Sequence, residues 1–86
     1  MPVLSRFYGI MIMMFFKDHN PPHVHAKYAG QIGIFDIRTH VIKGGKLPPH
    51  AVTLVQEWLR LHEKELMENW RRAQSDRPLK PVAPLK

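Results

Sequence analysis

The fold is decided by residues 8–37, which read YGIMIMMFFKDHNPPHVHAKYAGQIGIFDI. Residues 8–16 form an apolar run without polar alternation, and a short run of this kind is typical of a strand buried on both faces. The prolines at 21–22 end the run, because proline cannot donate a hydrogen bond to a strand ladder. Residues 23–29 and 31–37 follow as two further strands joined by a short glycine-containing turn. The sequence therefore predicts a small antiparallel sheet with the 8–16 strand at its centre.

The strand predicted over residues 23–29 has two different faces, because polar and apolar side chains alternate along it. One face carries Val24, Ala26 and Tyr28, and the opposite face carries His23, His25 and Lys27. Residues 39–42 predict a short edge strand that ends at Gly44-Gly45. The sheet should thus contain three or four strands.

Residues 49–73 show the period of an α-helix, with an apolar stripe made of Ala51, Leu54, Val55, Trp58, Leu59, Leu66, Trp70 and Ala73. We expect both tryptophans in the core. A helix of this length spans roughly 37 Å, which is long for so small a sheet, so we expect a bend or an overhanging end. His62 and Asn69 lie inside the stripe and need partners. They either bond to backbone at the sheet edge, face a cleft below the turn, or lie on a helix end that overhangs the sheet and is exposed or bound by a partner.

These segments predict an α+β fold, with a three- to four-stranded antiparallel sheet packed against one long C-terminal α-helix. Residues 1–74 should form a single domain and residues 75–86 a Pro-rich tail. Prolines at every third position of this tail suit a polyproline II segment, which either frays or docks on its own sheet or on a partner. The second face of the central strand must be covered by the tail or by another subunit, so we expect a homodimer or heterodimer.

Composition excludes several classes of site. The chain has 86 residues and no cysteine, which excludes disulfides, thiolate zinc sites and cysteine nucleophiles. The N-terminus does not resemble a signal peptide, and the apolar run is about half the length of a membrane helix, so we expect a cytoplasmic protein without membrane contact. The net charge of +6 predicts phosphate backbones or acidic proteins as partners.

The candidate chemical site is the turn at residues 18–25, which reads DHNPPHVH. His23 and His25 are two residues apart on a strand, so their imidazoles project from the same face. Imidazole titrates near neutrality, and a pair can supply the base and the acid that metal-free RNA cleavage requires. We therefore assign His23 and His25 as catalytic residues, with no metal and no cofactor.

Other residues are assigned supporting roles. The groups expected to bind or orient a phosphate substrate are His19, Asn20, Lys27 and Arg38. The supporting residues are Asp18, His62 and Asn69. Two alternatives stay open for the turn: a metal site in which His19 or Asp18 joins the two histidines, and a solvated strand cap with no chemistry.

Several segments together resemble the small bacterial domain-of-unknown-function family 4160. They are residues 5–10 (SRFYGI), the turn at 18–25, residues 44–48 (GGKLP), and Trp58 with 61–62 (LH) and 68–70 (ENW). The likeness covers about residues 2–80, and the turn is its most distinctive part. The connection at residues 43–46 is one residue longer than the family pattern. The resemblance implies a free-standing protein encoded beside a second small protein, as in toxin–antitoxin pairs.

Our leading functional interpretation joins these lines. The chain is a toxin–antitoxin-type component that acts on RNA through the His-rich turn, as a metal-independent ribonuclease, with a small cognate protein encoded nearby and RNA as partners. The first alternative is a non-catalytic protein- or nucleic-acid-binding module of a two-protein regulatory complex. The second alternative is a metal-binding domain that uses the His-x-His turn.

Overall fold

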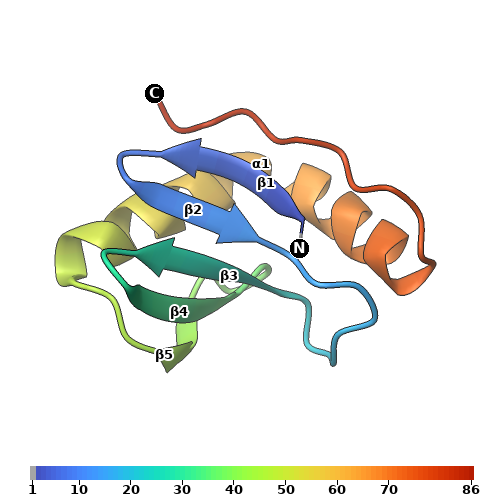
Figure 1. The fold of residues 1–86 in the computed structure, drawn as a ribbon, viewed down its shortest axis with the longest axis horizontal. Helices are drawn as coiled ribbons and strands as arrows, with labels where there is room; N and C mark the ends of the chain where they lie inside the picture. The colour runs from blue at the N-terminus through green and yellow to red at the C-terminus, as the bar shows by residue number, and fades with distance from the viewer. Residues whose placement is uncertain (1) are drawn as a thin grey trace.

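Five antiparallel strands and one long helix form the part of the chain that the computed structural model describes, residues 2–86 (Figure 1). The elements are β1 (Val3–Phe7), β2 (Ile10–Met13), β3 (His23–Tyr28), β4 (Gln31–Asp36), β5 (Ile42–Gly45) and α1 (Pro49–Gln74). The helix lies across one face of the sheet, behind the strands in Figure 1. This confirms the predicted α+β fold, with more strands than the three or four expected.

The additional strand lies at the N-terminus, where the prediction of a single strand over residues 8–16 is wrong. Tyr8 and Gly9 form a two-residue turn between β1 and β2, with φ angles of 49° and 79°. Both angles lie in the left-handed region, as a type I′ hairpin turn requires, and glycine reaches this region without steric cost. The apolar run therefore divides into a turn, the short strand β2 and the start of a loop.

The strands follow one another across the sheet in sequence order, so β3 is the middle strand rather than the apolar run. In this register Ile12 lies opposite Ala26, and Met11 lies opposite Lys27. Ile12 and Ala26 are fully buried in the core that the sheet shares with α1. Because side chains alternate along a strand, Met11 and Lys27 lie on the other face of the sheet.

Helix α1 starts with Pro49, where proline is tolerated because the first helical amides have no partner inside the helix. The backbone leaves the helical region at His62 (φ −120°, ψ 21°), which confirms the expected bend. Trp58 and Trp70 are 0% and 4% exposed, which confirms their place in the core. The bend allows the second half of α1 to follow the end of the sheet near the start of β3 (Figure 1).

The Pro-rich tail docks on its own domain and does not fray. It runs back beside the second half of α1 and along β1 (Figure 1), where the Val82 amide donates to the Leu4 carbonyl at 2.9 Å. The Trp58 indole N–H donates to the Ala83 carbonyl at 2.8 Å. Val82 and Leu85 are buried in the core cluster. The tail therefore covers the free edge of β1.

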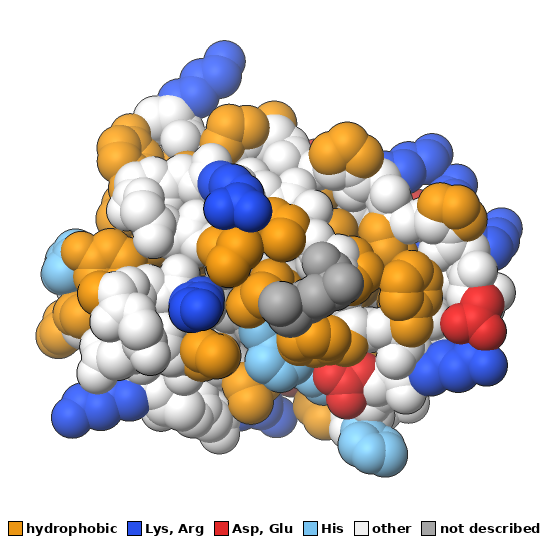
Figure 2. Space-filling view, viewed as in Figure 1, with side chains coloured by type: hydrophobic (Ala, Val, Ile, Leu, Met, Phe, Trp, Pro, Cys, Tyr) orange, Lys and Arg blue, Asp and Glu red, His pale blue; other side chains and the backbone are white. Residues whose placement is uncertain are grey.

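The face of the sheet turned away from α1 stays open to solvent over much of its area. Figure 2 shows hydrophobic side chains spread across this face, with basic and histidine side chains among them. Ile32, which lies opposite Lys27 on this face, is 45% exposed. Within residues 2–86, none of the helical sequence combines the length and the hydropathy needed to cross a bilayer.

Candidate metal centre in the histidine-rich turn

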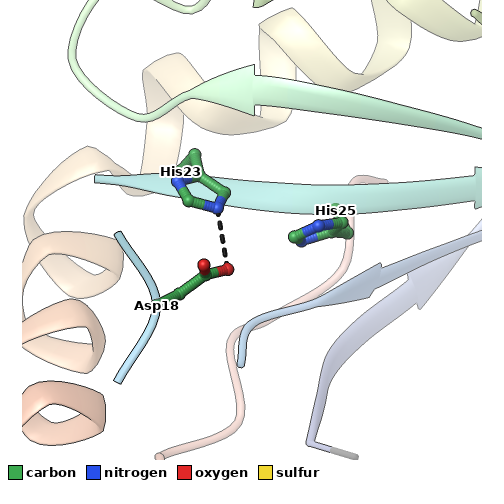
Figure 3. A group of neighbouring side chains, drawn as sticks. All are labelled: Asp18, His23 and His25. Atoms are coloured by element: carbon green, nitrogen blue, oxygen red, sulfur yellow. Dashed lines mark hydrogen bonds and ion pairs between the residues drawn. The ribbon is translucent and has the colours of Figure 1, made fainter. Parts of the chain in front are cut away.

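The loop between β2 and β3 is tied to the last turns of α1, which sets the position of Asp18. The Lys17 amide donates to the Ala73 carbonyl at 3.2 Å, and the Gln74 side-chain amide donates to the Asp18 carbonyl at 3.1 Å. The Pro22 carbonyl accepts the amide of Ile37, just beyond β4. The loop is thus held at both ends, and the Asp18 side chain lies over the start of β3 (Figure 3).

His23 is the first residue of β3, and both of its ring nitrogens face oxygen acceptors. Nδ1 lies 2.8 Å from the Pro21 carbonyl oxygen and donates to it, because a carbonyl can only accept. Nε2 lies 2.9 Å from Asp18 Oδ2. An imidazolium satisfies both contacts, because each of its ring nitrogens carries a hydrogen. A neutral ring satisfies them when a cation is bound between Nε2 and the carboxylate. The ring also packs against the Trp70 ring, with centroids 5.2 Å apart.

His25 lies two residues further along β3 and has no such partners. Its ring packs edge to face against the Phe15 ring, with centroids 4.6 Å apart, and its centroid lies 5.4 Å from that of the His23 ring. Nδ1 is buried, and no atom of residues 2–86 forms a hydrogen bond with it. Burial, and next the positive charge of His23, lower the pKa of His25, although the Asp18 carboxylate opposes them. His25 is therefore a neutral imidazole with an unpartnered ring nitrogen.

Asp18 supplies the carboxylate of the cluster. Burial alone would raise its pKa, but the hydrogen bond from the His19 amide and the contact with His23 outweigh burial and lower the pKa. The His19 amide donates to Oδ1 at 2.8 Å, which leaves Oδ2 directed at His23. Asp18 is therefore ionised at neutral pH, one quarter of its side chain being exposed.

Asp18, His23 and His25 together form the one group of potential metal ligands found within residues 2–86 (Figure 3). One ligand atom of each residue lies within 4.8 Å of the others. Two imidazoles and one carboxylate are a ligand set used by zinc and by non-haem iron enzymes. The bond from His23 Nδ1–H to a backbone carbonyl is the contact that usually orients a metal-binding histidine.

The other predicted site residues are distributed more widely. His19 is exposed and contributes only its backbone amide to Asp18. Lys27 lies on the open face of the sheet, opposite Met11 and Ile32. Asn20 and Arg38 do come together, as both line a cleft at the C-terminal end of α1.

His62 and Asn69 have partners elsewhere, so the structure does not bring them to the turn. His62 Nδ1 lies 2.7 Å from Glu65 Oε1 on the bent part of α1. Asn69 is 1% exposed and clamps the tail: its amide nitrogen donates to the Lys80 carbonyl, and its oxygen accepts the Lys80 amide, each at 2.8 Å. Asn69 follows the first of the three predicted alternatives, in which the buried polar group bonds to backbone.

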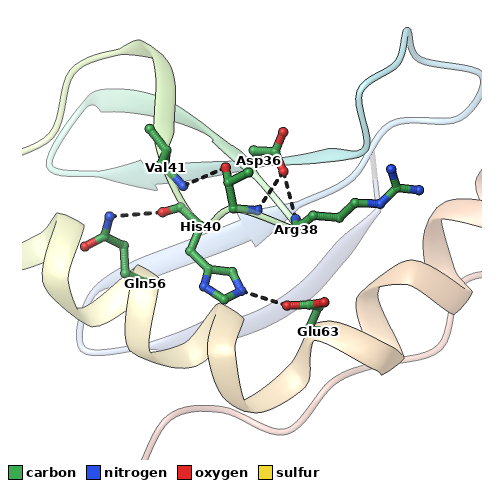
Figure 4. Close-up of polar contacts among 7 residues, drawn as sticks. Asp36, Arg38, His40, Val41, Gln56 and Glu63 are labelled. Atoms are coloured by element: carbon green, nitrogen blue, oxygen red, sulfur yellow. Dashed lines mark hydrogen bonds and ion pairs between the residues drawn. The ribbon is translucent and has the colours of Figure 1, made fainter.

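Sequence reasoning missed a second polar cluster that shapes the loop after β4 (Figure 4). Asp36 Oδ1 accepts the amides of Arg38 and Thr39, and the His40 ring lies 2.9 Å from a Glu63 carboxylate oxygen. The Gln56 side chain donates to the His40 carbonyl. An Asp followed by polar residues at the end of a strand is the available signal for such an Asx turn. This cluster ties the loop to α1 and directs the Arg38 side chain outward.

Comparison with known proteins gives one match. A family model described as "Domain of unknown function (DUF4160)" matches residues 9–71, which is most of the chain and includes the whole turn at 18–25. This confirms the resemblance seen in the sequence. No curated protein and no solved structure matches the chain.

Proposed function

Because the chain belongs to the DUF4160 family, whose description states no activity, we propose a function from the site itself: Asp18, His23 and His25 bind one divalent transition-metal ion. The observation that carries this proposal is the buried Nδ1 of His25, which has no hydrogen-bond partner within residues 2–86. A buried polar atom without a partner costs about 1–3 kcal/mol, so it needs an explanation. A metal ion shared with His23 and Asp18 would supply one if it binds His25 through this nitrogen, and a ring nitrogen of His25 does lie within 4.8 Å of ligand atoms of both residues.

The distances support this reading. A zinc ion binds imidazole nitrogen and carboxylate oxygen at about 2.0–2.2 Å in tetrahedral geometry, so two of its ligand atoms stand roughly 3.4 Å apart. The three ligand atoms lie within 4.8 Å of one another, and small side-chain rotations bring them to one ion. Asp18 is ionised and His25 is neutral, as metal ligands must be, and an ion bound between His23 Nε2 and Asp18 Oδ2 would take the place of the proton these two atoms share.

The same geometry gives less support to the metal-free acid–base chemistry expected from the sequence. A general acid or base must reach the reacting oxygen of the substrate. Both ring nitrogens of His23 already face acceptors within 2.9 Å, and Nδ1 of His25 is buried, so within residues 2–86 only Nε2 of His25 is left to this histidine pair, which cannot supply both the acid and the base. We therefore prefer the metal-binding alternative to the metal-independent ribonuclease.

We retain the proposal that the chain acts on RNA as the toxin–antitoxin-type half of a two-protein pair. The net charge of +6 supports it, as does the cleft beside the turn that Asn20 and Arg38 share. A metal held by Asp18, His23 and His25 would have coordination positions left for water and substrate and would supply a Lewis acid toward a phosphate oxygen. The competing non-catalytic module would bind the same partners without turnover.

The metal proposal is tested by calorimetric titration of chelator-treated, tag-free protein with zinc, nickel or manganese salts. The wild-type chain should bind one ion. Replacing a second-shell partner usually costs 10–100-fold in affinity, so His25→Ala, which removes a ligand, should weaken binding by about 100-fold or more. His50→Ala is the control, because His50 is exposed and contacts only Tyr28 among the aromatic residues. If His50→Ala weakens binding as much as His25→Ala, or if no metal binds, the proposal is wrong.

The protein partner is proposed on separate grounds. The open face of the sheet carries the exposed Ile32 beside Lys27, Met11 and Arg6, and an exposed apolar face of this kind favours a covering subunit. We expect the chain to co-purify with the small protein encoded beside it, and any growth inhibition to be relieved by that protein. Substituting Ile32 with lysine should abolish co-purification, whereas Leu61→Lys, on the exposed side of α1, should not.

A further inference from the structure

A basic cleft lies beside the metal ligands, between the histidine-rich turn, the loop after β4 and the C-terminal end of α1. Its volume is about 520 Å³. The lining includes three arginines, two amides and one indole: Arg38, Arg71, Arg77, Asn20, Gln74 and Trp70. No aspartate or glutamate lines it. Positive charge is therefore concentrated in this cleft.

The guanidinium groups of Arg38 and Arg77 are free to bind a ligand. Both residues are exposed, and neither forms a side-chain ion pair within residues 2–86. Figure 4 shows the Arg38 side chain extended away from the Asp36 turn toward the second half of α1. Arg71 makes only a long contact of 3.5 Å with Glu68 and is 61% exposed. Arg38 and Arg77, which form no ion pair within residues 2–86, repel each other and Arg71, so an anion in the cleft would be stabilised.

The backbone holds these arginines in place. The amide of Arg38 donates to Asp36 Oδ1, and the amide of Arg77 donates to the Arg72 carbonyl at the end of α1. The three arginines come from three separate segments, namely the loop after β4, the last turn of α1 and the start of the tail. Groups spread in this way across an open cleft suit a chain of anions better than a single carboxylate, and guanidinium and amide donors match phosphate oxygens.

We propose that this cleft binds the phosphodiester backbone of a nucleic-acid strand. Trp70 is 4% exposed and forms the floor of the cleft, so it does not stack on bases. Recognition is therefore through phosphates and independent of base sequence. The inference deepens the proposed action on RNA and rests on it for the choice of ligand.

The cleft and the metal ligands share structural elements. Asn20 lies in the turn that carries Asp18, and Gln74 donates to the Asp18 carbonyl. Trp70, on the cleft floor, packs against the His23 ring. A nucleic-acid strand that lies in the cleft thus passes the start of β3, where the proposed metal ligands lie.

The test is fluorescence anisotropy with a labelled single-stranded RNA oligonucleotide, and the DNA of the same sequence, in EDTA at several salt concentrations. The double variant Arg38→Ala/Arg77→Ala should bind at least tenfold more weakly than wild type. In a plot of log affinity against log salt, each phosphate contact with a single strand contributes about −0.7 to the slope. Loss of two contacts should therefore make the slope about 1.4 less steep. Arg60→Ala/Arg6→Ala is the control, since it removes the same charge from exposed positions outside the cleft.

Several results would overturn the proposal. The first is that wild type binds neither oligonucleotide. The second is that the control variant loses as much RNA affinity as Arg38→Ala/Arg77→Ala. The third is that polyglutamate displaces the labelled RNA as effectively as unlabelled RNA does. A chain that binds RNA but no metal would refute the metal site alone. One that binds metal but no RNA would refute both the cleft and the proposed action on RNA, and would leave the metal site standing.

Discussion

The clamp between Asn69 and the tail gives the most direct test of the fold. Asn69 is 1% exposed, and its side chain makes two hydrogen bonds of 2.8 Å to the backbone of Lys80. A hydrogen bond contributes about 0.5–1.5 kcal/mol net, so Asn69→Ala should lower the free energy of unfolding by about 2 kcal/mol.

Thermal unfolding measures this loss. For a domain of this size, 1 kcal/mol shifts Tm by about 4–8 °C, so Asn69→Ala should lower Tm by about 8–16 °C. Carboxypeptidase should also shorten the tail of the variant faster than that of wild type. Asn20→Ala, at an exposed position, is the control and should leave both unchanged. A Tm for Asn69→Ala within 2 °C or so of wild type, with an equally protected tail, would refute the clamp.

Three further predictions follow from other contacts. Zinc at about 100 times its Kd stabilises a folded chain by about 2.7 kcal/mol, so it should raise the Tm of wild type by roughly 11–22 °C. The Tm of His25→Ala should rise far less, and equal shifts for the two chains would contradict the metal site. Burial opposes ionisation of Asp36, but the Thr39 and Arg38 amides and Lys43 outweigh it and lower its pKa. The stabilisation by ionised Asp36 is complete above its ordinary pKa of 3.8 and is lost as the pH falls through the lowered pKa. The difference in free energy of urea unfolding between wild type and Asp36→Ala should therefore shrink below about pH 4. A difference that stays constant with pH would count against this prediction. Trp58→Phe removes the hydrogen bond to the tail and also leaves a cavity, because Trp58 is 0% exposed. It should therefore cost more than about 1 kcal/mol in urea unfolding, and a variant as stable as wild type would argue against that bond.

Much of the architecture could be predicted from periodicity. The alternation over residues 23–29 correctly separates the core side of β3 from the side that carries His23 and His25, because side-chain direction in a strand depends only on position. The helical period similarly predicts α1 and its buried tryptophans. The length of α1 predicts its bend, although not that the bend falls at His62.

The first strand shows where periodicity fails. A continuous apolar run contains no polar signal that separates a turn from a strand, so the turn at Tyr8-Gly9 and the strand β1 were missed. Tyrosine at a position with positive φ is uncommon, and only pairing between β1 and β2 reveals it. The centre of the sheet consequently moved from the apolar run to β3.

The sequence by itself determined which residue types meet in the turn, since two histidines two apart on a strand share a face whatever the rest of the fold does. Only the tertiary structure decided that Asp18 completes the cluster, because the last turn of α1 holds the loop that carries it. The tertiary structure also gave Asn69 to the tail and joined Arg38 to Arg77 across one cleft. Contacts between segments far apart in the chain depend on packing, which has no local pattern in the sequence.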